Sequence, residues 1–184
     1  MTDTIKTTLP PYILAVDQAT RSGWAVVLLG DGTVYASGVF DSRGHKADSG
    51  ESRGMRFVRF AKWLSAMTAP VMPTMICHEQ TIAMGMGGKS TSWATNDIAA
   101  GLKALMEKRA AELGIPITTV CPSTLKKWAT GSGRAGKAEM IKAASDKTRR
   151  KITDDNEADA ILIGLWAYNQ YAPGLKMGGR KDGE

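Results

Sequence analysis

Residues 12–40 read YILAVDQATRSGWAVVLLGDGTVYASGVF, three apolar runs in which β-branched and aromatic residues are frequent. Such residues favour strands because their side chains pack well on a pleated surface. Asp31-Gly32 separates the second run from the third and is typical of a hairpin turn. The stretch therefore predicts three consecutive strands, over residues 12–18, 23–30 and 33–40, paired as an antiparallel meander.

Beyond residue 40 the hydrophobic pattern changes to an alternation of strands and helices. Two short apolar runs, 74–79 and 116–122, predict buried strands. The expected helices cover residues 55–67, 92–113, 123–130, 137–147 and 155–171. Because alternation implies parallel strands joined by helical crossovers, we expect an α/β fold. Its sheet would be mixed and five-stranded, with three antiparallel strands followed by two parallel ones, and flanked by helices.

Glycine-rich polar segments separate these elements. We expect loops at residues 41–54 and at the Gly- and Met-rich residues 80–91. The segment GSGRAG at 131–136 separates two expected helices. Nothing in the pattern requires a second domain. We therefore expect one domain over residues 1–184, with 1–10 and about 173–184 as flexible tails.

The charge balance favours an anionic partner, nucleic acid among others. The chain carries 24 Lys and Arg against 18 Asp and Glu, a formal charge of +6. No run approaches the ~18 apolar residues that span a bilayer, and the first residues contain no apolar signal segment. Cys77 and Cys121 lie within apolar runs, which argues against a disulfide framework. We expect a cytoplasmic protein with no membrane partner.

Carboxylates occur where their burial would be costly. Asp17 lies within the first apolar strand and Glu79 ends the fourth, while Asp154, Asp155, Glu157 and Asp159 open the last helix, with Asp155 and Asp159 on one face. Carboxylates on separate elements suit hard divalent cations, so we expect Mg²⁺ or Mn²⁺. Two such ions can activate a water and stabilise the leaving oxygen of a phosphodiester. The competing interpretation is that Asp17 belongs to a turn and that the late acids cap a helix.

Four segments resemble the RuvC family of Holliday-junction resolvases in their order and spacing. They read AVDQATRSGWAVV at 15–27, HEQ at 78–80, LKKWATGSGRAGKAEM at 125–140 and NEADAILIG at 156–164. The third is the most specific, and the resemblance spans residues 11–171. It implies a ribonuclease H-like fold and a metal-dependent endonuclease that resolves four-way DNA junctions. It also implies a homodimer, paired in the family through the helix that follows the Gly- and Met-rich loop, where residues 98–113 carry a small and apolar stripe suited to such a contact.

The resemblance implies that Asp17, Glu79 and Asp159 are catalytic carboxylates that bind the metal ions. A fourth ligand lies three residues before the last aspartate in the best-known members, as Asp or His. That position is Asn156 here, and Asp155 precedes it. Either Asn156 ligates through its amide oxygen or Asp155 takes the role, and we favour Asp155 because it carries charge.

The resemblance also implies DNA contacts. Lys126 and Lys137 match family lysines near the scissile phosphate, where a compact positive charge suits an anionic oxygen. Ile82 occupies the loop position at which the family usually inserts an aromatic wedge into the junction. Further expected DNA contacts are Lys89, Lys127 and Arg134.

Two departures from the family pattern leave alternatives open. Gln18-Ala19 replaces the usual Pro-Gly after the first Asp, and Ile82 offers no ring for stacking. One alternative is a broader nuclease of flaps, forks and three-way junctions, as in phage-type members. Another, prompted by Asn156, is a catalytically silent junction-binding protein, and a third is an actin-like sugar kinase or ATPase domain. GSGRAGK lacks the spacing of a phosphate-binding loop, so we expect no nucleotide cofactor.

Overall fold

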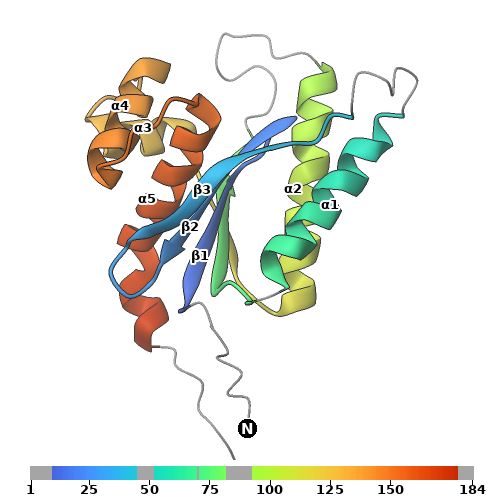
Figure 1. The fold of residues 1–184 in the computed structure, drawn as a ribbon, viewed down its shortest axis with the longest axis horizontal. Helices are drawn as coiled ribbons and strands as arrows, with labels where there is room; N and C mark the ends of the chain where they lie inside the picture. Colours follow the sequence, from blue (N-terminus) through green and yellow to red (C-terminus); the bar gives the residue numbers. More distant parts are fainter. Residues whose placement is uncertain (1–9, 45–51, 70, 82–92, 178–184) are drawn as a thin grey trace, which may run out of the picture.

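The computed structural model describes residues 10–44, 52–69, 71–81 and 93–177. They form a five-stranded sheet in the order β3-β2-β1-β4-β5, with helices on both faces (Figure 1). The strands are β1 (Tyr12–Asp17), β2 (Arg21–Leu28), β3 (Val34–Asp41), β4 (Met75–Glu79) and β5 (Ile117–Val120). The helices are α1 (Gly54–Thr68), α2 (Trp93–Leu113), α3 (Pro122–Thr130), α4 (Lys137–Thr148) and α5 (Asp155–Met177).

The first three strands form the predicted meander. β1 pairs antiparallel with β2, and β2 pairs antiparallel with β3. The turn between β2 and β3 has Gly32 at φ 79°, a left-handed conformation that suits glycine, and the Thr33 N–H donates to Asp31 Oδ1 at 2.9 Å. β4 then adds parallel to β1, and β5 parallel to β4. The α/β class and the mixed sheet are both confirmed.

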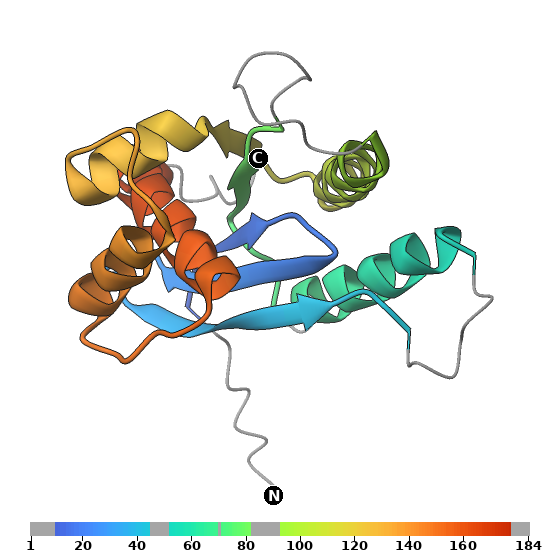
Figure 2. The same ribbon diagram turned by 90° about the horizontal axis from the view of Figure 1, so that it is seen from above.

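The sheet separates two apolar cores. Alternate residues of β1 point to opposite faces, so Ile13 and Ala15 contact the core beneath α5, and Leu14 and Val16 contact the core beneath α1 and α2. Figure 2 shows α3, α4 and α5 on one side of the sheet and α1 and α2 on the other. Every residue of β1 except its last is buried, as expected for a central strand.

Some element boundaries differ from the predictions. Helix α3 begins at Pro122 rather than Ser123, because proline at the first helical position has no N–H that needs an intrahelical partner. Helix α5 was expected to end at Tyr171 but continues to Met177 with Pro173 inside it. Ala172 is buried in the α5 core, so packing on the sheet outweighs the hydrogen bond that proline removes.

Two further predictions concern segments that lie only partly within the described residues. The predicted tails, 1–10 and about 173–184, lie mostly outside them, and so do residues 82–91 of the predicted Gly- and Met-rich loop. Within the described residues, no helix has the length and apolar character needed to cross a membrane.

Candidate active site

Asp17 and Glu79 end two neighbouring parallel strands. The register of β1 with β4 runs to Val16 opposite His78, and Asp17 and Glu79 are the next residues on the two strands. Alternation places both carboxylates on the α5 side of the sheet, two residues after Ala15 and Cys77 of the α5 core. The carboxyl ends of β1 and β4 thus bring together two acids that are far apart in the sequence.

The first turn of α5 supplies the other acids. Asp154 is the residue before the helix, and its Oδ1 accepts hydrogen bonds from the backbone N–H groups of Asn156 at 2.9 Å and Glu157 at 3.3 Å. Its Oδ2 accepts a hydrogen bond from Arg21 at 2.9 Å. The interpretation of the late acids as helix caps is therefore correct for Asp154. Asp155 and Asp159 lie one turn apart within the helix, so capping does not account for them.

A missing side chain lets α5 approach the sheet at this point. Gly23 of β2 lies opposite Asp17 in the register, and a Cβ on Gly23 would lie 1.8 Å from the backbone oxygen of Asn156. Further along the helix, a Cβ on Gly164 would lie 2.6 Å from Val27 Cγ2. The sequence analysis did not single out Gly23. A glycine inside a strand was the available indication, because it often marks a close backbone approach.

The clustered carboxylates repel one another. Burial raises the pKa of Asp17 well above its ordinary value, and the charges of Glu79, Asp159 and Asp155 raise it further. Burial, then the Asp159 charge, raises the pKa of Glu79 to about 7. Burial is also the main cause that raises the pKa of Asp159 to about 6. These shifts show that strands β1 and β4 and helix α5 bring their acids within electrostatic reach of each other.

Two lysines face this negative cluster. The Lys126 ammonium, from α3, lowers the pKa of both Glu79 and Asp159. Lys137, the first residue of α4, forms an ion pair and hydrogen bond with Asp155 and thereby lowers the pKa of that carboxyl. Gly131 ends α3 at φ 85°, a left-handed conformation that lets the chain reverse into α4. The GSGRAG turn thus packs α3 against α4, and each of the two helices contributes one of the lysines.

No family model and no curated protein sequence matches the chain. Solved structures do. RuvC of Thermus thermophilus superposes with a TM-score of 0.66 at 19% identity, covering 91% of this chain and 96% of that one. The T. thermophilus RuvC structure in complex with a Holliday junction substrate gives 0.71 at 16% identity, covering 90% and 97%.

This chain has the RuvC fold. The yeast mitochondrial Holliday junction resolvase is a third structural relative, with a TM-score of 0.55 at 14% identity and coverage of 92% of this chain and 85% of that one. The ribonuclease H-like architecture implied by the resemblance to RuvC is therefore confirmed. The match covers nearly the whole length of both RuvC structures, so the elements that carry the acids are part of this shared fold.

The donors of the acid cluster fit a hard divalent cation in chemistry and charge. Asp17, Glu79 and Asp159 offer only oxygen ligands, and none of the three carboxylates has a hydrogen-bond partner among the described residues. Within those same residues, no group of three His, Cys, Asp or Glu side chains is arranged to hold a metal ion. Binding by all three would therefore require the carboxylates to turn toward one another. The raised pKa values indicate mutual repulsion that a cation would relieve.

The remaining predicted site residues divide into three groups. Asn156 directs its amide to Asp154, with Nδ2 donating to Oδ1 at 3.2 Å, so its side chain is engaged at the helix cap. Lys127 and Arg134 are exposed, on α3 and in the turn that follows it. Ile82 and Lys89 lie outside the described residues, so their roles stay predictions.

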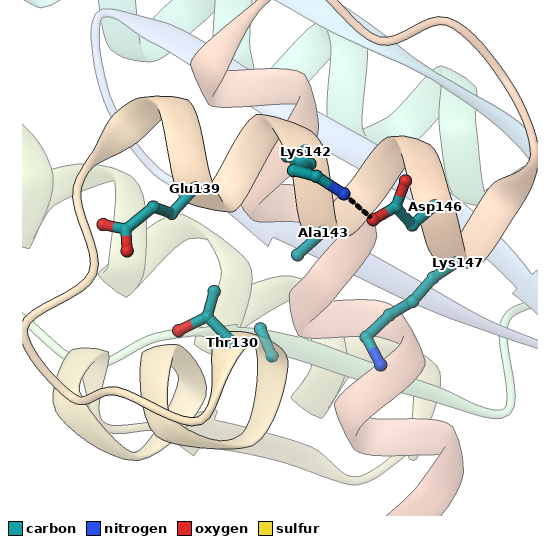
Figure 3. A pocket seen from close by; sticks show the side chains of 7 residues that line it. Thr130, Glu139, Lys142, Ala143, Asp146 and Lys147 are labelled. Atoms are coloured by element: carbon teal, nitrogen blue, oxygen red, sulfur yellow. Dashed lines mark hydrogen bonds and ion pairs between the residues drawn. The ribbon is translucent and has the colours of Figure 1, made fainter.

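A separate groove of about 450 Å³ lies between α3 and α4 (Figure 3). Thr130, Glu139 and Lys147 are among its lining residues, and Lys142 donates to Asp146 across one helical turn at 2.6 Å. None of the clustered carboxylates lines this groove. The other two charged lining residues are also engaged, because Glu139 accepts a hydrogen bond from the Gly136 N–H and Lys147 lies over the Trp128 ring, so these residues form no cluster of like charges such as the one at the sheet end.

Proposed function

We propose that this protein is a RuvC-family endonuclease that resolves four-way DNA junctions by metal-dependent hydrolysis of phosphodiester bonds. One observation carries the proposal: Asp17, Glu79 and Asp159 share one negative cluster at the carboxyl end of the sheet, and Lys126 and Lys137 face it. Buried like charges with raised pKa values are costly for a fold, and they are typical of sites that bind cations or perform catalysis. The RuvC fold supports the same conclusion.

Each side chain has a chemical role in this proposal. Asp17, Glu79, Asp159 and Asp155 hold Mg²⁺ or Mn²⁺, as two ions, through their oxygens. When bound, such ions activate a water and stabilise the oxygen that leaves phosphorus. Lys126 and Lys137 stabilise the negative charge that grows on the scissile phosphate. Asp155 is a better fourth ligand than Asn156 because its carboxylate faces Asp17 and Asp159, whereas the Asn156 amide is engaged by Asp154.

Branched DNA is the proposed substrate. Lys127 and Arg134 are exposed on α3 and on the turn between α3 and α4, so they add positive charge to the surface of the two elements that carry the site lysines. A phosphate backbone would follow such a surface, while the acids and bound ions act on one of its bonds. The chain's formal charge of +6 favours the same partner.

A homodimer is proposed on the symmetry of the reaction alone. Two opposed incisions in a four-way junction call for two sites related by a two-fold axis. The apolar stripe of α2, which was expected to pair two subunits, is instead buried in its own chain through Ile98, Leu102, Met106 and Ala110. A second copy would therefore contact the other faces of α2.

A broader branched-DNA nuclease is the second candidate. It is favoured by Ile82, which would wedge into a junction without the ring face that strengthens stacking on a base. Strict selection of four-way junctions needs such a discriminating contact. In the broader case the same carboxylates and lysines would act on forks, flaps and three-way junctions.

The test is cleavage of labelled four-way, three-way, flap and linear duplex DNA, each with Mg²⁺ or with EDTA, by wild type and Asp17→Asn. We expect wild type to cut branched DNA only with Mg²⁺, and Asp17→Asn to bind the junction but not cut it. Comparable cutting of three-way and four-way junctions would select the broader nuclease. Junction binding without cutting by wild type would leave a silent binding protein and overturn the proposal.

A further inference from the structure

Two buried side chains converge on one backbone oxygen beside the acid cluster. Gln18 Nε2 donates to the Glu79 carbonyl oxygen at 2.5 Å and to Thr81 Oγ1 at 3.3 Å. His78 Nδ1 lies 2.8 Å from the same carbonyl oxygen. A carbonyl oxygen only accepts, so the His78 ring carries its proton on Nδ1. The Glu79 carbonyl therefore receives donors from both the end of β1 and its own strand.

The contact lies where the strand ladder stops. The register of β1 with β4 ends at Val16 opposite His78, so the hydrogen bond from Gln18 joins the two strands beyond their last paired residues. On the other side of β4, the Gln80 N–H donates to the Val120 oxygen of β5 at 2.9 Å. Glu79 is thereby held from both neighbouring strands at the residue where β4 ends. Fixing its backbone fixes the direction in which its carboxylate leaves the sheet.

The polar groups at this contact cost the fold stability. Gln18 is 8% exposed and His78 is 1% exposed. Gln18 Oε1 and His78 Nε2 are both buried without a hydrogen-bond partner among the described residues. An apolar side chain of similar size at position 18 would fill the same space with no unsatisfied oxygen. The presence of a glutamine at position 18 is explained if its amide has a role in the candidate site.

We propose that Gln18 is a positioning residue for Glu79, and that its amide, with His78, fixes the Glu79 backbone so that the carboxylate meets that of Asp17 at a shared metal ion. The inference rests on the proposed function. Its distinctive point is that one dipeptide, Asp17-Gln18, supplies both a ligand and the clamp on the ligand of the neighbouring strand. Partners that orient ligands in this way typically account for about 10- to 100-fold in metal affinity or activity.

The test compares Gln18→Met, which keeps the length of the side chain and removes its donor, with Gln170→Met. Gln170 is exposed near the far end of α5 and controls for the substitution itself. Three quantities are measured: Mn²⁺ affinity by calorimetry without DNA, the single-turnover cleavage rate on saturating four-way junction, and junction affinity with Ca²⁺ or EDTA. We expect Gln18→Met to lower Mn²⁺ affinity and the rate by about 10- to 100-fold and to change junction affinity by less than about twofold.

Equal Mn²⁺ affinity and equal rate in the two variants would overturn the clamp while the proposed function stands. A wild type that neither binds Mn²⁺ nor cuts would overturn both. If Gln18→Met does not fold, nuclear magnetic resonance of the wild type decides. We expect the Gln18 side-chain amide protons to exchange slowly with solvent and to shift on addition of Mg²⁺. Rapid exchange with no shift would overturn the clamp.

Discussion

Substitution of Gly23 by alanine tests whether the close packing of α5 on β2 sets the geometry of the carboxylates. The new Cβ would lie 1.8 Å from the Asn156 backbone oxygen, and ordinary contact begins near 3.4 Å. Relief by helix movement alone requires 3.4 − 1.8 = 1.6 Å at the turn that carries Asp155 and Asp159. Metal–ligand distances tolerate only about 0.2 Å. The carboxylates of α5 would therefore no longer reach ions held by Asp17 and Glu79.

We expect Gly23→Ala to lower the single-turnover cleavage rate by at least about 100-fold, the loss that a displacement of about 1 Å can cause. Overpacking should also reduce the free energy of unfolding by about 1–3 kcal/mol. The assay is cleavage of labelled four-way junction at saturating protein and Mg²⁺, at a temperature where thermal unfolding shows each variant to be folded. Mn²⁺ affinity, measured by calorimetry, should fall in parallel.

Gly164→Ala is the matched control on the same helix. Its Cβ would lie 2.6 Å from Val27 Cγ2 and 3.1 Å from Ala15 Cβ, so it also overpacks α5 against the sheet, but away from the first turn. We expect a comparable loss of stability and a cleavage rate within about threefold of wild type when folded. Equal loss of cleavage in both variants, or a fully active Gly23→Ala, would refute the reasoning.

Three further predictions follow from the charges at the site. Burial raises the pKa of Glu79 to about 7, above its unfolded value of 4.5, so the stability this group contributes is complete below pH 4.5 and lost as the pH rises through about 7. Metal-free wild type should therefore lose more thermal stability than Glu79→Gln between pH 5 and pH 8, and an equal loss would contradict the shift. Lys126→Ala should slow cleavage at saturation by more than about tenfold, whereas exposed Lys127→Ala should weaken junction binding and reduce its salt slope by about one. Asp155→Asn should reduce Mn²⁺ affinity and cleavage more than Asn156→Ala does, and the reverse order would make Asn156 the fourth ligand.

Much of the fold could be predicted from the sequence because its strands have unambiguous patterns. β1 is apolar throughout and central, and the Asp31-Gly32 turn pairs β2 with β3 as expected. The predicted end of α5 was wrong because the helix-breaking tendency of Pro173 is a local property of the sequence. The burial of Ala172, which favours a longer helix, is a tertiary contact that the sequence does not show. The stripe of α2 shows the same limit, since an apolar pattern reports burial but not whether the partner is the same chain or a second one.

The acids of the candidate site could be singled out from the sequence because a carboxylate within or at the end of an apolar strand is costly to bury. Asp17 and Glu79 were singled out in this way, and the structure places them in one cluster with Asp155, which contacts Lys137; the metal-binding roles of these residues stay predictions. The supports of the site were missed. The role of Gly23 depends on where α5 crosses β2, and that of Gln18 on a carbonyl sixty-one residues away, so neither leaves a periodic pattern in the sequence.

The sheet separates the half of the molecule that contains the candidate site from a supporting half formed by α1, α2 and their core. All the clustered carboxylates and both site lysines belong to the half that contains α3, α4 and α5, while Phe60, Leu64 and Leu102 fill the half beneath α1 and α2. Apart from His78, whose side chain faces α2 and belongs to the proposed clamp, substitutions in the supporting half can therefore change the stability of the fold with little effect on the positions of the acids. Tolerance to mutation should differ between the two sides of one five-stranded sheet, and the stability that the buried charges cost can be recovered on the side that carries none of them.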